Sequence, residues 1–257
     1  MGIIKDVRKE QKQFILENYS DKGIDFCAKH LGLTRLQTKK RAQYLGVKLK
    51  EYNYLKDFYP INRESAYTLG FVSGDGYVSK DNNTVSIEFK SEDAEDIDNI
   101  LMFTQWKKYY RQRLHWKPIT TYHICNKQLA DWLRQYGFCE KSFSTPNIIG
   151  ILPEEFLHYF LLGIFDADGC IGIKKIYKKR YGNLQISADK DFDWSLLKSV
   201  FEPRIGVLFK GTKTKHCSCI HLYNKKDIFR FYDYIYQNYH LDNIGLTRKY
   251  DKFNEID

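Results

Sequence analysis

The sequence lacks the features of a membrane-spanning or secreted protein. No stretch reaches the roughly 18 consecutive apolar residues that a membrane-spanning helix needs. Residues 1–7 include Lys5 and Asp6 and lack the apolar core of a signal peptide. We therefore expect a protein without a membrane partner that is kept inside a cell, in the cytoplasm or nucleoid of a bacterial or phage host or in an organelle.

Paired cysteines are also missing, although the chain contains six cysteines. They show neither CxxC spacing nor a regular disulfide framework, so we expect free thiols in a reducing compartment. The segment HCSCIH, from His216 to His221, contains potential zinc ligands. Its spacing suits a strand, on which neighbouring side chains point to opposite faces, so we do not expect zinc there.

Basic charge is concentrated at the N-terminus of an otherwise nearly neutral chain. Hydrophobic residues make up 43% and charged residues 28% of the 257 residues, which is typical of a globular protein. Residues 1–50 hold 12 Lys/Arg and 5 Asp/Glu, a net charge of +7, which leaves +2 for the remaining 207 residues. Such a basic module favours nucleic acid, because neutralised phosphates release their counterions, although a solvated lysine-rich surface would look the same.

The pattern of residues 1–50 predicts short helices around a turn. Apolar residues recur at helical spacing from Ile24 to Leu31, and Gly32 and Thr34 then supply a turn and a helix cap. The next helix places Ala42 inward and its basic residues mostly outward. We interpret residues 1–50 as a helix-turn-helix-like DNA-binding domain; a small helical bundle with a charged face is the alternative. The expected DNA contacts are Arg35, Lys39 and Lys40.

An internal repeat follows residues 51–63, which we interpret as an aromatic linker that docks on the rest of the chain. The segment Thr68–Gly76 reads TLGFVSGDG, and Leu161–Gly169 reads LLGIFDADG, at an offset of 93 residues. The later segments HICNK and HLYNK match at an offset of 98 residues. The difference predicts a longer first hairpin in the second copy, around residues 174–181.

Each copy predicts the same element order: helix, strand, strand, helix, strand, strand, helix. In the first copy, a helix over 64–74 precedes a hairpin whose turn is Asp81-Asn-Asn83. The remaining expected elements are a strand over 84–89, a helix over 91–103, strands over 107–116 and 120–125, and a helix over 126–136. The second copy follows this order to about residue 237.

The two nonamers resemble the motif that names the LAGLIDADG family of homing endonucleases. The second is close to the consensus and the first is looser, and the resemblance covers roughly residues 64–250. It implies an α+β fold in which two αββαββα halves, 64–145 and 146–257, form a pseudo-twofold pair. Their antiparallel sheets are expected to form a saddle on double-stranded DNA. A single chain with two motifs is expected to act as a monomer on a long asymmetric site.

Small residues within the motifs allow the two helices to pack closely. Gly70 and Gly74 are four positions apart, as are Gly163 and Ala167, so each pair leaves one helix face without bulky side chains. Paired helices would bring Asp75 and Asp168 together, where two carboxylates repel unless a cation lies between them. Mg²⁺ prefers such oxygen ligands. The alternative, two ordinary helix C-terminal turns, puts acidic residues at the negative end of a helix dipole.

The resemblance also implies the chemistry of the site. Asp75 and Asp168 would bind divalent metal, Mg²⁺ or Mn²⁺, with the backbone carbonyls of Gly74 and Ala167, and water would hydrolyse both strands to leave 3′ overhangs. Lys90 matches the family's basic residue at the end of the second strand; an ordinary exposed lysine is the alternative.

The second copy departs from this pattern. It has Asp189 where Lys90 stands, with Lys190 beside it, so its basic residue is left open and unequal cutting of the strands is an expectation. Ser73 stands where Asp166 stands in the second motif, a position expected to affect capping and packing rather than chemistry.

Basic and aromatic residues alternate along strands that would face DNA. A bare solvent face with lysines is the alternative. The expected contacts in the first copy are Lys107, Tyr109, Arg111 and Arg113. Those in the second copy are Lys175, Lys179, Lys213 and Lys215.

Two other functions remain open at this point: an RNA maturase that assists intron splicing, and a DNA-binding regulator that does not cut. An intein is not expected, because the chain has no splicing cysteine at its start and no His-Asn at its end.

Overall fold

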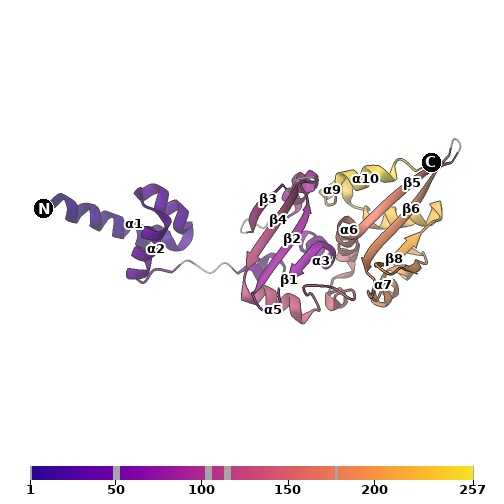
Figure 1. Cartoon of the computed structure of the whole chain (residues 1–257), viewed down its shortest axis with the longest axis horizontal. Helices are drawn as coiled ribbons and strands as arrows, with labels where there is room; N and C mark the ends of the chain where they lie inside the picture. Colours follow the sequence, from indigo (N-terminus) through magenta and orange to yellow (C-terminus); the bar gives the residue numbers. More distant parts are fainter. Residues whose placement is uncertain (1, 49–52, 102–105, 113–116, 177–178, 257) are drawn as a thin grey trace. The chain divides into compact units, whose positions relative to one another are not determined.

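The computed structural model describes residues 2–48, 53–101, 106–112, 117–176 and 179–256, with the side chains of 2–8, 174–176 and 179–180 left out (Figure 1). The chain divides into two compact units, Met1–Asn53 and Tyr54–Asp257, which are described separately. In the described residues, no helix is long and apolar enough to cross a membrane.

The first unit is helical, as the sequence predicts. It consists of α1 (Gly2–Leu31) and α2 (Arg35–Tyr44), and α1 is interrupted at Gly23, whose φ of 82° is not helical. The side chain of Thr34 accepts a hydrogen bond from the backbone of Gln37, and the Gln37 side chain bonds the Thr34 backbone in return, a capping box that starts α2. The helices enclose a small core formed by Ile15, Tyr19, Cys27 and Ala42.

The second unit has the α+β architecture expected from the repeat. Its first half contains α3 (Arg63–Asp75), β1 (Gly76–Val78), β2 (Thr84–Lys90), η2 (Ser91–Asp93), α4 (Ala94–Ile100), β3 (Lys107–Arg111), β4 (Ile119–Cys125) and α5 (Lys127–Gln135). Its second half contains α6 (Leu157–Asp168), β5 (Gly169–Ile176), β6 (Lys179–Asp189), α7 (Ser195–Ile205), β7 (Lys210–Lys213), β8 (Cys217–Leu222) and α8 (Lys225–Ile235). A C-terminal segment adds α9 (Tyr239–Asp242) and α10 (Thr247–Phe253).

Each half forms one four-stranded antiparallel sheet, and the two sheets have equivalent strand orders, β1-β2-β4-β3 and β5-β6-β8-β7. The first hairpin of the second half is longer, as predicted, because β5 has 8 residues and β1 has 3. Along β2, Val85, Ile87 and Phe89 are buried and the residues between them are more exposed. Each sheet of this kind packs one face on the core and leaves the other open.

Helices α3 and α6 pack against each other between the two sheets (Figure 1). A Cβ on Gly70 would lie 2.0 Å from the backbone oxygen of Phe160, and one on Gly163 would lie 2.1 Å from that of Tyr67. Only glycine fits at these positions, because the two backbones are in direct contact there.

Part of the expected linker belongs to the second unit. The short helix η1 (Tyr54–Asp57) and the fully buried Phe58 pack on this unit, and Phe58 lies near Trp132 of α5 with ring centroids 6.1 Å apart. Phe58 and the partly buried Tyr54 thus dock on this unit, whereas Tyr59 is 60% exposed and Tyr52 lies outside the described residues. The separation between units falls at Asn53 and Tyr54.

Candidate metal centre

Each central helix ends at an aspartate and turns at once into a strand. Asp75 is the last residue of α3 and Asp168 the last residue of α6, and a glycine begins the strand that follows. A Cβ on Gly76 would lie 2.2 Å from the Val72 carbonyl oxygen, and one on Gly169 would lie 2.4 Å from that of Phe165. The glycines therefore permit the abrupt change from helix to strand that fixes the two aspartates at the helix ends.

The two aspartates lie close together. A Cβ on Gly74 would lie 2.7 Å from the Asp168 Oδ2 and 2.6 Å from the Ala167 Cβ, so the end of one helix rests on the end of the other. Burial raises the pKa of Asp75 to about 6. Burial and then the neighbouring Asp75 carboxylate raise the pKa of Asp168 to about 7. Ionising both carboxyl groups in this buried pair therefore costs free energy, and a bound cation would lower that cost.

Two cavities open at these helix ends, and each is shared between the halves. The first, of about 310 Å³, is lined by Asp75 of α3 and by Ala167 and Gly169 from the end of α6. The second, of about 380 Å³, is lined by Asp168 of α6 and by Gly74 and Gly76 from the end of α3. Each cavity thus combines the last aspartate of one motif with main-chain atoms from the helix end of the other.

The donors fit a hard divalent cation. Carboxylate and carbonyl oxygens are suitable ligands for Mg²⁺, which keeps several waters and demands few protein ligands. In the part of the chain that the structure describes, no group of three or more His, Cys, Asp or Glu side chains could hold a metal, the HCSCIH segment included. The buried Oδ1 of Asp166, which lines the first cavity, has no hydrogen-bond partner among the described residues. Asp75, Asp168 and the Gly74 and Ala167 carbonyls would hold the cations.

Lys90 lies where the sequence predicts it, at the end of β2 beside Asp75. It lines the first cavity, and its charge opposes the raised pKa of Asp75. Its Nζ is 3.8 Å from Glu92, and about half of its side chain is exposed. An ammonium in this place can approach a phosphate without being fixed in a buried ion pair.

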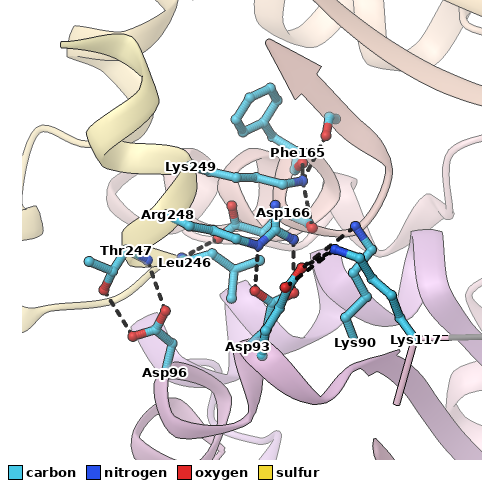
Figure 2. Close-up of polar contacts among 12 residues, drawn as sticks. Lys90, Asp93, Asp96, Lys117, Phe165, Asp166, Leu246, Thr247, Arg248 and Lys249 are labelled. Atoms are coloured by element: carbon cyan, nitrogen blue, oxygen red, sulfur yellow. Dashed lines mark hydrogen bonds and ion pairs between the residues drawn. The ribbon is translucent and has the colours of Figure 1, made fainter. Parts of the chain in front are cut away.

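Lys249 was not identified from the sequence, although it is central to the site. Its ammonium, on the 7% exposed side chain, donates hydrogen bonds to the carbonyl oxygens of Phe165, Asp166 and Gly169 at 2.6, 2.7 and 2.7 Å (Figure 2). Burial lowers its pKa to about 8. Its charge opposes the raised pKa of both Asp75 and Asp168, so it acts as a resident cation at the end of α6. The stretch TRKYDKF has no signal that separates Lys249 from an exposed helical lysine.

The segment around Lys249 fastens the two halves together beside the first cavity. Arg248 bonds Asp93 through two nitrogens, one at 2.8 Å, and Thr247 bonds Asp96, both acidic residues of the first half (Figure 2). The backbone N–H of Leu246 donates to Asp166 at 2.8 Å.

Asp166 also holds a contact across the halves. It accepts a hydrogen bond from the Tyr67 hydroxyl at 3.0 Å, and its carboxylate is buried. These contacts place Asp166 in the packing between the halves; the expected effect of this position on capping and packing stays a prediction for both Asp166 and Ser73.

The residues expected to face DNA lie on several surfaces. Lys107, Tyr109 and Arg111 are exposed on β3 and pair with His123, Thr121 and Ile119 of β4. Arg111 also pairs with Glu88 at 2.6 Å. Through the register of β2 and β4, these residues share the open face of the sheet with Lys90. Arg113 lies outside the described residues, as do the side chains of Lys175 and Lys179, whose backbones lie in β5 and β6.

In the second sheet the strand register places Lys210 and Lys213, both in β7, on opposite faces. Of the two expected contacts, Lys213 and Lys215 are both exposed. Lys213, however, pairs with Ser218 and lies on the side of the buried Ile186, where its Nζ is 3.2 Å from Asp191. Lys210, which the sequence analysis did not single out, pairs with His221 and is exposed on the open face. The strand period of two gives this assignment once the register is known.

In the N-terminal unit, Arg35 forms an ion pair with Asp25 at 2.5 Å, whereas Lys39 and Lys40 are exposed. Beside them is a cavity of about 350 Å³ lined by Lys12, Lys40, Arg41 and Tyr44, the last with 83% of its surface exposed. Basic and aromatic groups are thus available on one side of α2.

The raised pKa values predict a pH-dependent response to divalent cations. Because Asp75 and Asp168 hold protons more tightly when folded than when unfolded, the free energy of unfolding should fall as pH rises from about 4 to about 7. Ca²⁺ should then raise the melting temperature clearly at pH 8 and little at pH 5. Thermal unfolding with and without Ca²⁺ measures this, with the Asp75→Asn/Asp168→Asn double variant as control. Equal Ca²⁺ effects at both pH values would contradict the site.

Comparisons with known proteins identify the fold. No protein-family model matches the sequence, and no curated protein matches it. The LAGLIDADG meganuclease I-AabMI, solved bound to uncleaved DNA, is similar in structure, with a TM-score of 0.50 and 15% identity over 76% of this chain and 88% of that one. I-SmaMI, bound to uncleaved DNA with calcium, gives 0.49 and 12% over 74% and 89%.

Full-length WhiA from Thermatoga maritima also matches, with a TM-score of 0.49 and 13% identity over 76% of this chain and 60% of that one. At such identities a similarity shows the fold alone. The element order, the two antiparallel sheets and the match to I-AabMI confirm the expectation from the two motifs: residues 54–257 have the LAGLIDADG fold.

Proposed function

We propose that the chain is a site-specific DNA endonuclease of the homing type. It would hydrolyse both strands of a long asymmetric duplex with Mg²⁺ or Mn²⁺ and leave 3′ overhangs. The observation that carries this proposal is the pair of shared cavities, each with the last aspartate of one motif and the main chain of the other motif. A binding protein without chemistry would have no use for two half-buried carboxylates that repel each other at the end of a helix.

Double-stranded DNA is the proposed partner. I-AabMI, which shares the fold, was solved bound to uncleaved DNA. In this chain, the open face of the first sheet carries exposed Lys107, Tyr109 and Arg111 on the same side as Lys90. Long basic side chains in that arrangement would contact phosphates and base edges and place a phosphodiester over the helix ends.

The roles of the residues follow from their positions. The divalent cations would polarise the phosphate and activate the attacking water. Asp75 and Asp168 would hold them from opposite halves, together with the Gly74 and Ala167 carbonyls. Lys90 would stabilise negative charge on the phosphate above the Asp75 site. Lys249, whose three donors are occupied by main-chain carbonyls, would hold the end of α6 in place and would take no part in proton transfer.

A cleavage assay tests the proposal. The protein is incubated with duplex DNA that spans the uninterrupted insertion point of its own gene, in Mg²⁺, in Ca²⁺ and in EDTA. We expect double-strand breaks with 3′ overhangs in Mg²⁺, binding without cleavage in Ca²⁺, and no product in EDTA. Binding with no product in Mg²⁺ or Mn²⁺ would favour a regulator, and stimulated splicing of an intron RNA without DNA cleavage would favour a maturase.

The N-terminal unit is expected to add affinity rather than chemistry. Removing residues 1–50 should weaken binding and flatten its salt dependence, while cleavage persists at low salt and high enzyme concentration, because both motif aspartates lie in the second unit. Replacing Lys39 and Lys40 with alanine should lower the slope of log affinity against log salt by about 2. The measurement is affinity across a salt series, with Lys29→Ala on α1 as control. Identical salt slopes for the full-length protein and the protein without residues 1–50 would show that the unit does not contact DNA.

A further inference from the structure

The strand register identifies Asp189 as the counterpart of Lys90. Gly76 at the start of β1 pairs with Ile87, and Gly169 at the start of β5 pairs with Ile186. Three residues further along, β2 ends at Lys90 and β6 ends at Asp189. The basic residue of the first site is therefore replaced by an acid in the second.

Asp189 binds a lysine from elsewhere in the chain. The Nζ of Lys141 lies 2.8 Å from the Asp189 Oδ2, and both residues line the second cavity with Asp168. This ion pair lowers the pKa of Asp189. Lys141 belongs to the connection between the halves, after α5 and before α6, and 62% of its side chain is exposed, so its ammonium can reach a bound phosphate.

The residues on both sides of Lys141 are held in place by hydrogen bonds. Glu140 accepts hydrogen bonds from the Tyr77 hydroxyl at 2.9 Å and the Lys80 N–H at 3.0 Å, which ties it to the first half. The Phe143 carbonyl accepts a bond from Asp193 at 2.8 Å, and Ser144 forms a parallel bridge with Asp193, which ties the segment to the second half. The lysine thus projects from a segment anchored at both ends and is not carried by a free loop.

The charges of the two cavities show why this lysine matters. The first cavity has four basic residues against three acidic ones. The second has three acidic residues, Glu140, Asp168 and Asp189, and Lys141 is the one basic residue that lines it within the described ranges. Without Lys141, the charged side chains that line this cavity would all be carboxylates.

We propose that Lys141, oriented by Asp189, supplies the phosphate-facing ammonium of the Asp168 site. The inference rests on the proposed endonuclease function and assigns the residue that motif spacing leaves open. The two sites would obtain their lysine in different ways. Lys90 projects directly from the end of its strand, whereas Asp189 at the equivalent position holds a lysine from the connection between the halves.

Strand-resolved cleavage tests the assignment. With each strand of the duplex labelled separately, Lys141→Met should slow hydrolysis of one strand about tenfold or more, so that nicked DNA accumulates. Lys90→Met should slow the other strand. The matched control is Lys190→Met, which removes an exposed lysine paired with Asp191 near the same strand end and should leave both rates unchanged. The double variant Lys141→Met/Asp189→Lys moves the lysine to the position of Lys90 and should recover most of the lost rate.

Binding of Mn²⁺ without DNA gives a second readout. Lys141→Met removes a positive charge from the second cavity and should strengthen binding of Mn²⁺, measured by calorimetry, whereas Lys190→Met should not. Wild-type protein that cuts no duplex would refute the proposed function itself. Wild-type protein that cuts both strands, together with a Lys141→Met variant that cuts them at unchanged rates, would overturn the role of Lys141 and leave the endonuclease function intact.

Discussion

Replacing either Asp75 or Asp168 with asparagine is expected to abolish double-strand cleavage and to leave DNA binding largely intact. Each carboxylate lines a separate cavity, so under the proposed function the loss of one would leave a single cleavage site, which would cut one strand. The neutral amide removes the charge that attracts the cation but keeps the size of the side chain. We expect the rate of double-strand cleavage to fall by roughly a hundredfold or more.

Plasmid linearisation and a binding assay in Ca²⁺ together measure this effect. Asp131→Asn, which alters an exposed aspartate paired with Lys127 and Arg134, serves as the control and should cut like wild type. Robust linear product from either motif variant would refute the assignment of the metal ligands. A motif variant that loses both cleavage and binding would indicate a structural role for the aspartate.

The second large effect is expected at the contact between the central helices. A methyl group on Gly70 or Gly163 would overlap the backbone of the opposite helix, so even alanine must force the helices apart. We expect Gly70→Ala and Gly163→Ala each to lower the free energy of unfolding by about 3 kcal/mol or more, at the upper end of overpacking costs. Leucine, with a longer branched side chain, should be worse at either position.

Urea unfolding measures this loss, and Gly150→Ala provides the control because no atom lies within 4 Å of the added methyl group. Cleavage should fall with stability in the helix variants, since the same contact sets the distance between Asp75 and Asp168. Free energies of unfolding equal to wild type in both variants would contradict the close approach of α3 and α6.

The LAGLIDADG fold was predictable because local and repeated patterns in the sequence specify it. Two nonamers with small residues four positions apart predict a close helix pair, and the same strand and helix order after each predicts two equivalent sheets. The longer hairpin of the second half followed from a five-residue difference between two offsets. The roles of Asp75, Asp168 and Lys90 came from the resemblance and remain predictions that the variants above test.

Other site residues could not be predicted from such patterns. Lys249 lies 80 to 84 residues after the residues whose carbonyls it binds, and it is not part of either motif. Lys141 lies in a connection without a strong pattern, and its partner Asp189 looked like the loss of a basic residue. Lys210 and Lys213 differ only in which face of the sheet they occupy, which depends on the pairing of β7 with β8.

By itself the sequence determined the two-unit plan, the paired helices and the aspartates at their ends. Hydrophobic periodicity, glycine spacing and repetition specify local structure and one helix contact, and these are properties of short segments. The tertiary structure decided which charges surround each aspartate. It brings the C-terminal Lys249 and Arg248 to the first cavity and Lys141 to the second, so two similar motifs have different electrostatic surroundings. Those contacts depend on chain segments that meet only after folding, because charge acts through space and not along the sequence.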